Sequence, residues 1–238
     1  MANTLELGNG KWATGKDTVL AFNDENNNFK PLPFSFSRAS SGTVINKDGL
    51  IETVGSGEPR IDFKDNTKGS LLLEPTRTNK LTTSKDFSSF IKSGTVTTTT
   101  DYGISPSGQT DSTRVVFSSS NNAFYKLSIH SGNTETNSMY VKGTVGETIK
   151  FGKGATVNGG GIFTLNGKWQ RLDFVSTTGN QFTINTYSSV TARDIEIWGA
   201  QVEEGSYATS YIPTSGQANG VTRVADSSSQ TVPSGIYG

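Results

Sequence analysis

Short runs of alternating apolar and polar residues recur along most of this chain, and turn residues such as Gly, Asn, Asp and Ser separate them. Alternation is clearest in Trp169–Phe174 and in Ile195–Trp198. A period of two places one face of a strand in a core and the other face in solvent. The pattern therefore predicts a protein of β-strands, without the alternating helices of an α/β fold.

Strand signals are densest between residue 94 and about residue 213. Eight or nine short strands joined by Gly-rich turns are typical of two sheets packed face to face. We therefore predict a jelly-roll β-sandwich over residues 81–213, with Trp169 and Trp198 in its core. The expected strands are Val96–Thr100, Thr113–Ser118, Phe124–Ile129, Ser138–Lys142, Thr148–Gly152, Gly161–Leu165, Trp169–Val175, Phe182–Tyr187 and Asp194–Val202.

A second group of strand signals lies upstream, and Lys47-Asp48-Gly49 between two of them is typical of a hairpin turn. The predicted fold class is therefore all-β, with a small β-rich N-terminal module at residues 1–80 before the sandwich and a polar C-terminal tail at residues 214–238. The upstream strands are expected at Phe34–Arg38, Thr43–Ile45, Leu50–Val54, Arg60–Phe63 and Ser70–Glu74.

The two ends of the chain are polar. Trp12 and Leu20 give the first 30 residues enough apolar surface to pack on their own domain, or to anchor the chain on another protein. In the tail, Val221–Asp226 faintly echoes Ser37–Ser40. We expect the tail to add an edge strand or to enter a neighbouring subunit.

The composition narrows the class of protein. Aromatic residues make up 10% of the chain, which excludes general disorder. Formal net charge is zero and basic residues do not cluster, so a nucleic-acid groove or binding to an anionic membrane is not expected. No apolar run approaches the roughly 18 residues of a membrane span. The chain lacks a signal-peptide pattern and contains no cysteine, which suits assembly in a reducing cytoplasm.

Catalytic patterns are missing from the sequence. His130 is the only histidine, and no Gly-x-Ser-x-Gly elbow accompanies it. One histidine without cysteine cannot fill a typical zinc site. Asp62, Asp65, Glu74 and the pair Glu203–Glu204 resemble ordinary solvated charges, whereas a glycan depolymerase needs two carboxylates about 5–10 Å apart in a groove. We therefore expect no enzyme activity, no catalytic residues and no cofactor.

Two other kinds of site stay open. A structural calcium ion would need converging oxygens, which Asn23–Asn26 or Glu203–Glu204 could supply, although no EF-hand spacing is present. A carbohydrate site would need exposed aromatic rings beside polar side chains. Tyr125, Tyr140 and Tyr187 are the candidates for stacking on sugar, and buried tyrosines with bonded hydroxyls are the alternative.

A compact set of motifs lies between Phe36 and Lys80. It resembles a module of tailed-bacteriophage virion proteins (head spikes, head fibres and tail fibres) with the pattern R-A-S-x-x-T-x-(V/I)-x-x-x-G-(L/I), then P-R-x-D, then G-x-L-L-(L/I)-E-P-x-R-T-N. Lys80 stands where this pattern has Leu. The matching residues are Arg38, Ala39, Ser40, Thr43, Ile45, Gly49, Leu50, Pro59, Arg60, Asp62, Gly69, Leu71, Leu72, Leu73, Glu74, Pro75, Arg77, Thr78 and Asn79.

The polar residues of this module are structural rather than catalytic in type. Arginine forms bidentate bonds with carboxylates and also bonds backbone carbonyls, which can lock irregular loops. We expect the motif arginines to pair internally with nearby carboxylates, or else to contact another subunit or a capsid protein. The structural motif consists of Arg38, Arg60, Asp62, Glu74, Arg77 and Asn79, and the nearby carboxylates are Glu58, Asp62, Asp65 and Glu74.

A second resemblance lies in Ile195–Thr214, which is similar to the last strand and exit of a carbohydrate-binding-module-like jelly roll. The two resemblances imply a structural protein of a tailed-phage virion, located on the head or the tail and assembled in the host cytoplasm. They imply other virion proteins as partners and a homotrimer as the form in solution. The alternative is a carbohydrate-binding adhesion module that recognises host surface glycans.

Overall fold

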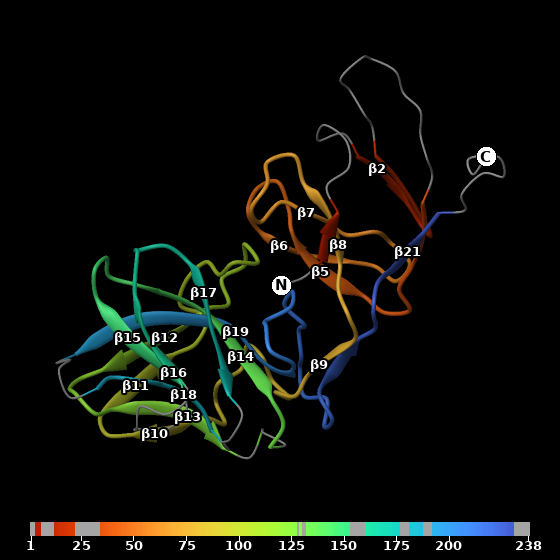
Figure 1. The fold of residues 1–238 in the computed structure, drawn as a ribbon. Helices are drawn as coiled ribbons and strands as arrows, with labels where there is room; N and C mark the ends of the chain where they lie inside the picture. The colour runs from red at the N-terminus through yellow and green to blue at the C-terminus, as the bar shows by residue number, and fades with distance from the viewer. Residues whose placement is uncertain are drawn as a thin grey trace, which may run out of the picture. The chain divides into compact units, whose positions relative to one another are not determined.

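The structure is a computed structural model that describes residues 3–5, 12–21, 34–127, 129, 132–152, 160–176, 181–187 and 192–230. Every regular element within these ranges is a β-strand (Figure 1). They include no helix, and hence none that could cross a membrane. The predicted all-β class is confirmed.

The chain divides into two compact units. Unit 1 comprises Met1–Arg77 together with Thr222–Gly238, and unit 2 comprises Thr78–Val221. Unit 2 is therefore inserted, in sequence, between two parts of unit 1. This division differs from the expected one at residues 80 and 213, because the chain from residue 222 onward groups with the N-terminal module instead of forming a separate tail.

Unit 1 contains small antiparallel sheets with the strand orders β1-β8-β7, β2-β3-β4-β21 and β5-β6. Its strands are β1 (Asn3–Leu5), β2 (Trp12–Gly15), β3 (Thr18–Ala21), β4 (Phe34–Ser37), β5 (Gly42–Ile45), β6 (Ile51–Val54), β7 (Ile61–Asp62), β8 (Ser70–Leu73) and β21 (Ser227–Ser229). β9 (Arg77–Asn79) and β20 (Val221–Arg223), each of which contains a boundary between the units, pair with each other.

Both ends of the chain contribute to one sheet of unit 1. β21, blue in Figure 1, pairs antiparallel with β4, so the expected edge strand from the tail is present. β3 pairs with the same strand β4, and β2 follows β3. Residues 12–21 therefore pair within their own unit.

The turn between β5 and β6 forms the predicted hairpin. Asn46 Oδ1 accepts hydrogen bonds from the backbone N–H groups of Asp48 and Leu50, both at 3.0 Å. Gly49 has a φ of +77°, a left-handed conformation that glycine adopts without a Cβ clash. The residue types of this turn therefore fix its geometry locally.

Unit 2 is a sandwich of two five-stranded antiparallel sheets. We call the sheet β10-β13-β18-β15-β16 the β18 sheet and the sheet β11-β12-β19-β14-β17 the β19 sheet, after their central strands. The strands are β10 (Ile91–Ser93), β11 (Val96–Thr99), β12 (Thr113–Phe117), β13 (Ala123–Leu127), β14 (Glu135–Gly143), β15 (Thr148–Gly152), β16 (Gly160–Thr164), β17 (Gln170–Ser176), β18 (Gln181–Asn185) and β19 (Arg193–Glu204). All nine predicted sandwich strands are therefore present.

Apolar side chains from the two sheets form one core in unit 2. Leu172 and Phe174, from the alternating run of β17, belong to it. Trp198 is buried, but on the outward face of the β19 sheet, beside Tyr140. The prediction of a core position was wrong for Trp169, which is only half-buried: it precedes β17, and its indole N–H donates to the Ile104 carbonyl at 3.0 Å.

Candidate functional site

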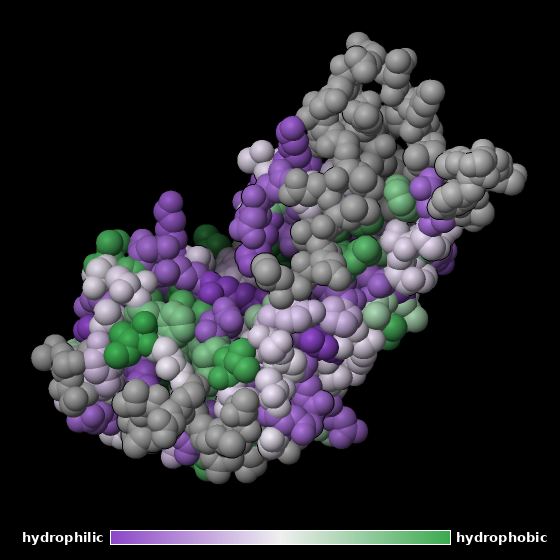
Figure 2. All heavy atoms as spheres, viewed as in Figure 1, coloured by the Kyte–Doolittle hydropathy of each residue, from purple (hydrophilic) through white to green (hydrophobic). Residues whose placement is uncertain are grey.

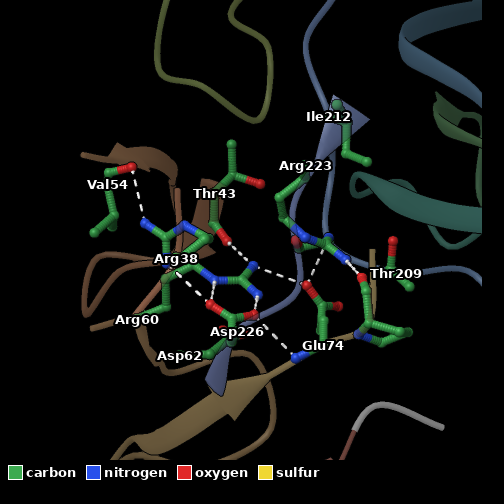
Figure 3. Close-up of polar contacts among 12 residues, drawn as sticks. Arg38, Thr43, Val54, Arg60, Asp62, Glu74, Thr209, Ile212, Arg223 and Asp226 are labelled. Carbon is green, nitrogen blue, oxygen red and sulfur yellow. Dashed lines mark hydrogen bonds and ion pairs between the residues drawn. The ribbon is translucent and has the colours of Figure 1, made fainter. Parts of the chain in front are cut away.

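Two arginines of the motif that resembles phage proteins (the phage-like motif), Arg38 and Arg60, enter a buried ion-pair network in unit 1 (Figure 3). Arg38 Nη1 donates to Asp226 Oδ1 at 3.0 Å, and both side chains are fully buried. The remaining N–H groups of Arg38 donate to the carbonyls of Ser40 at 2.7 Å and Gly55 at 2.5 Å. Arg38 therefore links the start of β5 to the end of β6 and to the C-terminal segment.

Arg60 lies at the centre of the network. It forms a bidentate pair with Asp226, in which Nη2 contacts Oδ2 and Nε donates to Oδ1 at 3.3 Å. Its Nη1 lies 2.8 Å from Glu74 Oε2 and donates to the Thr43 carbonyl at 3.1 Å. No part of Arg60 is exposed, so these oxygens replace the water that its charge would otherwise bind.

Arg223 completes the network from the C-terminal part of unit 1. Its Nη1 lies 2.7 Å from Glu74 Oε2, and its Nη2 donates to the Pro75 carbonyl at 2.6 Å. Backbone groups add two hydrogen bonds to this network: Asp226 N donates to the Glu74 carbonyl, and Glu74 N donates to Asp226 Oδ2, both at 2.9 Å. Neither Arg223 nor Asp226 was among the predicted site residues. The faint resemblance of Val221–Asp226 to Ser37–Ser40 was the feature of the sequence that could have indicated them.

Burial and the ion pairs shift the pKa values of these arginines in opposite directions. Burial lowers the pKa of Arg38, with the carboxylate of Asp226 opposing it. Burial also favours the neutral form of Arg60, but Glu74 and Asp226 outweigh it and raise the pKa of Arg60. Both arginines therefore stay protonated, and the ion pairs hold their side chains in place.

Asp62 and Arg77 lie in the same motif but have other contacts. Asp62 Oδ1 accepts from the backbone N–H groups of Ile45 at 3.2 Å and Lys64 at 2.9 Å, and burial raises the pKa of its carboxyl. Arg77 Nη1 donates to the Thr76 carbonyl at 3.2 Å. Asp62 therefore orders the turn after β7.

Asn79, the last residue of the motif, belongs to unit 2. It is fully buried, and its Nδ2 donates to the carbonyls of Ala200 at 3.2 Å and Ile212 at 2.9 Å. Its Oδ1 accepts from the N–H groups of Leu81 and Val202, both at 3.1 Å. Two donors and two acceptor positions are all used, so this amide holds three chain segments together.

Lys80, which departs from the pattern of the phage proteins that the motif resembles, has a structural role in unit 2. Its ammonium donates to Glu135 Oε1 at 2.6 Å and to Glu204 Oε1 at 2.8 Å. The Glu135 side chain is almost fully buried. Burial opposes the charge of Lys80, but the two carboxylates outweigh it and raise the pKa of the ammonium.

The second motif also consists of buried structural bonds. Glu203 Oε1 accepts from Gln201 Nε2 at 2.7 Å and from the Thr209 N–H at 2.8 Å. Gln201 Oε1 accepts from the Ile212 N–H at 2.7 Å. These bonds fasten the segment after β19 back onto β19, so Glu203 is not a solvated carboxylate.

The other candidate chemistry finds little support in the described residues. No three His, Cys, Asp or Glu side chains in these ranges could hold a metal ion together. His130 and the calcium candidate Asn23–Asn26 lie outside the described residues. In the other calcium candidate, Glu203 is committed to Gln201 and Thr209, and Glu204 bonds Lys80 and Asn133.

A groove of about 550 Å³ lies in unit 1, between the β2–β3 and β5–β6 hairpins. Its charged lining residues are exposed and of both signs: Lys16, Lys47, Asp48, Glu52 and Glu58. Such solvated charges do not select a ligand chemistry.

The three candidate tyrosines are not brought together. Tyr140 lies on the outward face of the β19 sheet, where it packs edge-to-face on Trp198, with ring centroids 5.7 Å apart. Arg171 covers it at 5.5 Å from the ring centroid. Tyr102 and Trp169 of this unit are likewise covered by cations, Arg114 and Lys142. These rings are therefore poor sugar platforms.

Tyr125 and Tyr187 belong to the other side of the sandwich. Tyr187 follows β18, and its hydroxyl lies 2.9 Å from Thr148 Oγ1. Tyr125 is half-exposed on β13, with Ile91 and Thr183 as its cross-strand neighbours. Within the described residues its ring and hydroxyl have no aromatic, cationic or hydrogen-bond partner.

The outward face of the β18 sheet carries polar residues that the sequence analysis missed. Thr183, Asn185 and Lys150 are buried there, on the side opposite Phe182, Ile184 and Phe151. Thr183 Oγ1 and Asn185 Nδ2 have no hydrogen-bond partner. Buried polar groups are normally bonded, so these two mark the face as a candidate binding site. Lys150 could have been noticed as a charge inside an apolar strand.

Apolar side chains gather only in small groups on the molecular face shown in Figure 2, among polar residues. On the β18 sheet the exposed apolar residues are Ile91, Leu127 and Ile162, which flank the three buried polar ones. This is the mixed lining that ligand sites commonly have.

The comparisons with known proteins are sparse. No family model matches the chain. No curated protein matches it significantly. A solved structure from work on the promiscuous specificity of carbohydrate-binding modules of the β-sandwich superfamily is similar to 81% of this chain and 96% of its own, with 9% identity and a TM-score of 0.36.

Proposed function

We propose that this chain is a non-catalytic binding protein whose sandwich binds carbohydrate on the outward face of the β18 sheet. One observation carries the proposal: a half-exposed tyrosine, Tyr125, lies directly across from Thr183, whose buried hydroxyl is unbonded, and one pleat from Asn185, whose amide is unbonded. Sugars present apolar faces for stacking and hydroxyl groups for hydrogen bonds, which is the chemistry that this face offers.

The contrast between the two sheets supports this choice of face. On the β19 sheet the aromatic rings of Tyr140 and Trp198 pack on each other, and the cation of Arg171 covers Tyr140. On the β18 sheet the ring of Tyr125 has no such contact with the described residues. Only the second arrangement leaves a ring face for a ligand.

The same reasoning favours binding over hydrolysis. Two of the carboxylates considered in the sequence analysis are held by structural partners: Glu74 by Arg60 and Arg223, and Glu203 by Gln201 and Thr209. A glycosidase needs a pair of carboxylates facing the scissile bond.

The test is a glycan array followed by titration calorimetry on the oligosaccharides that bind. Tyr125→Ala should weaken binding at least tenfold, since aromatic stacking contributes on the order of 1–3 kcal/mol by analogy with base stacking. Tyr102→Ala, which replaces an exposed tyrosine between β11 and β12 of the other sheet, is the matched control and should bind like the unmodified chain. Absence of any bound glycan, or unchanged affinity of Tyr125→Ala, would refute the proposal.

A second candidate function is that of a structural component of a tailed-phage virion, with the sandwich displayed on the head or tail. The supporting observation is that the phage-like motif forms the buried centre of unit 1, while unit 2 is inserted between its two parts. Unit 1 would then attach to other virion proteins. This function is compatible with glycan binding, because a displayed sandwich could bind host surface glycans.

Two measurements test the virion assignment. Mass spectrometry of purified particles should find the chain in stoichiometric amounts with the capsid or tail proteins. Light scattering of the purified chain should give the mass of a trimer, as expected for a fibre or spike. Absence from particles would rule out the assignment, and a monomer would rule out a self-standing fibre.

A further inference from the structure

Lys150 is the charged residue of the candidate face. It lies on β15 between Ile149 and Phe151, whose side chains enter the core, so its own side chain lies on the outward face. It is only 5% exposed, and the structure gives its ammonium no hydrogen bond or ion pair with any described residue. Burial of a lysine without an anionic partner is costly.

Other lysines of unit 2 differ from Lys150, because they are paired with carboxylates. Lys80 pairs with Glu135, Lys85 with Asp111 at 2.8 Å, and Lys142 with Glu196 at 2.9 Å. All three are more exposed than Lys150. The least exposed of these four lysines is thus the one without a carboxylate.

The surroundings of Lys150 offer further donors but no acid. Asn185 is its cross-strand neighbour on one side and Ile162 on the other. Asn185 Nδ2 and, one pleat along β18, Thr183 Oγ1 are unbonded. Along the five strands, the described outward positions of this sheet contain no Asp or Glu.

We propose that the ligand of this face is a saccharide that carries a carboxylate, such as a uronic acid, and that Lys150 pairs with that carboxylate. This inference rests on the proposed carbohydrate binding and names its substrate class. An ammonium, an amide N–H and a hydroxyl together match an anionic acceptor, and charge-assisted hydrogen bonds are about twice as strong as neutral ones.

The spacing across the sheet fits an oligosaccharide. Tyr125 and Lys150 lie on strands that flank β18 on its two sides, which puts them about 10 Å apart across the sheet. One sugar unit of the oligosaccharide can stack on Tyr125 while the carboxylate of another sugar unit reaches Lys150. Thr183 and Asn185 lie between the two points and bond the ligand oxygens there.

Calorimetry with a matched pair of ligands tests the inference: an oligogalacturonate and the same oligomer with its carboxyl groups methyl-esterified. The unmodified chain should bind the acid form at least tenfold more tightly. Lys150→Met should lose this preference, Lys150→Arg should keep most of it, and Lys126→Met, a lysine on neighbouring β13, should bind like the unmodified chain. Equal affinity for both ligands, or an unchanged preference in Lys150→Met, would overturn the inference.

The outcomes separate this inference from the proposed function. If neutral glycans bind and Tyr125→Ala weakens that binding, the carbohydrate function stands and only the acidic specificity fails. If no glycan binds, both fail. A readout without ligand exists as well: Lys150→Met should unfold at a higher temperature than the unmodified chain, because an unpaired buried charge is removed. A lower unfolding temperature would show that Lys150 already has a partner, against the inference.

Discussion

Arg60 and Asp226 are separated by 166 residues in the sequence and form a bidentate ion pair with no exposed side-chain surface. Arg60 belongs to the phage-like motif, and Asp226 follows the inserted sandwich in the chain. The motif is therefore completed by the far end of the described chain.

Replacement of Arg60 should destabilise unit 1 strongly. Arg60→Met leaves Asp226 and Glu74 buried without their central cation, and the loss of one partner from a buried pair costs about 3–5 kcal/mol. Urea unfolding followed by amide hydrogen exchange in β5 and β8 would measure it. The control Arg114→Met removes an exposed pair with Asp194 and should change stability little. Similar losses in both variants would contradict this account.

Removal of the C-terminal segment should unfold unit 1 while unit 2 stays folded. A chain that ends at Val221 lacks Arg223, Asp226 and the edge strand β21. Exchange protection should then disappear from β5 and β8 and persist in β14 and β19. A chain that ends at Gln230 keeps all of these contacts and serves as the control. Full protection of unit 1 after removal of residues 222–238 would refute the dependence.

Substitution of Lys80 by leucine, the residue that the phage pattern has at this position, should destabilise unit 2. Lys80→Leu takes the ammonium away from the buried Glu135, at a cost of about 1–2 kcal/mol because Lys80 itself is partly exposed. Thermal unfolding at pH 7 would show the loss. The double variant Lys80→Leu/Glu135→Gln should recover part of it, and a Lys80→Leu chain more stable than the original would contradict the assigned role.

Asp62 should make stability depend on pH in a defined direction. Burial raises the pKa of its carboxyl in the folded state, so the stability linked to its neutral form is complete below the ordinary aspartate pKa and is lost as the pH rises through the folded pKa. Asp62→Asn keeps a neutral acceptor for Ile45 and Lys64. It should be more stable than the original near pH 7, and the difference should close towards pH 4.

Urea midpoints of both proteins across this range would check the Asp62 prediction. A difference that stays constant with pH would show that the effect of the substitution is unrelated to the titration of this carboxyl.

Gly220 should not tolerate a side chain. Its φ is +73°, and a Cβ there would lie 2.0 Å from the Asn79 carbonyl oxygen. Gly220→Ala should therefore cost about 2–4 kcal/mol, from backbone strain plus displacement of Asn79. Gly216 has a φ of +95° with open space around it, so Gly216→Ala should cost only about 1–2 kcal/mol. Thermal unfolding of the two variants separates strain from clash; equal losses would contradict the clash.

Local patterns were enough to place most strands. Alternation in Trp169–Phe174 located β17 to within a residue, because a period of two is a local property of the chain. The Asp48-Gly49 turn was equally clear, since its geometry depends on a left-handed glycine. The core position predicted for Trp169 was wrong because Trp169 precedes β17, and the burial of a side chain outside a strand depends on its tertiary contacts.

The candidate site was harder to foresee. Tyr125, Tyr140 and Tyr187 were chosen as a group, but the register of two separate sheets divides them and leaves Tyr140 packed on Trp198. Lys150, Asn185 and Thr183 gather only through pairing of strands that are distant in sequence. Such pairing follows from the core of the whole sandwich and not from any local pattern.

The sequence by itself determined the all-β class, the strand positions and the presence of a motif rich in Arg and carboxylates, because these follow from local periodicity and residue chemistry. The tertiary structure alone decided which charges meet. Arg38 and Arg60 share the distant Asp226, Arg60 also pairs with the nearby Glu74, and Lys150 meets no acid at all among the described residues. The reason is physical. A buried charge needs a partner within a few ångströms, and whether two residues more than a hundred positions apart come that close depends on how the whole chain folds, not on the local sequence.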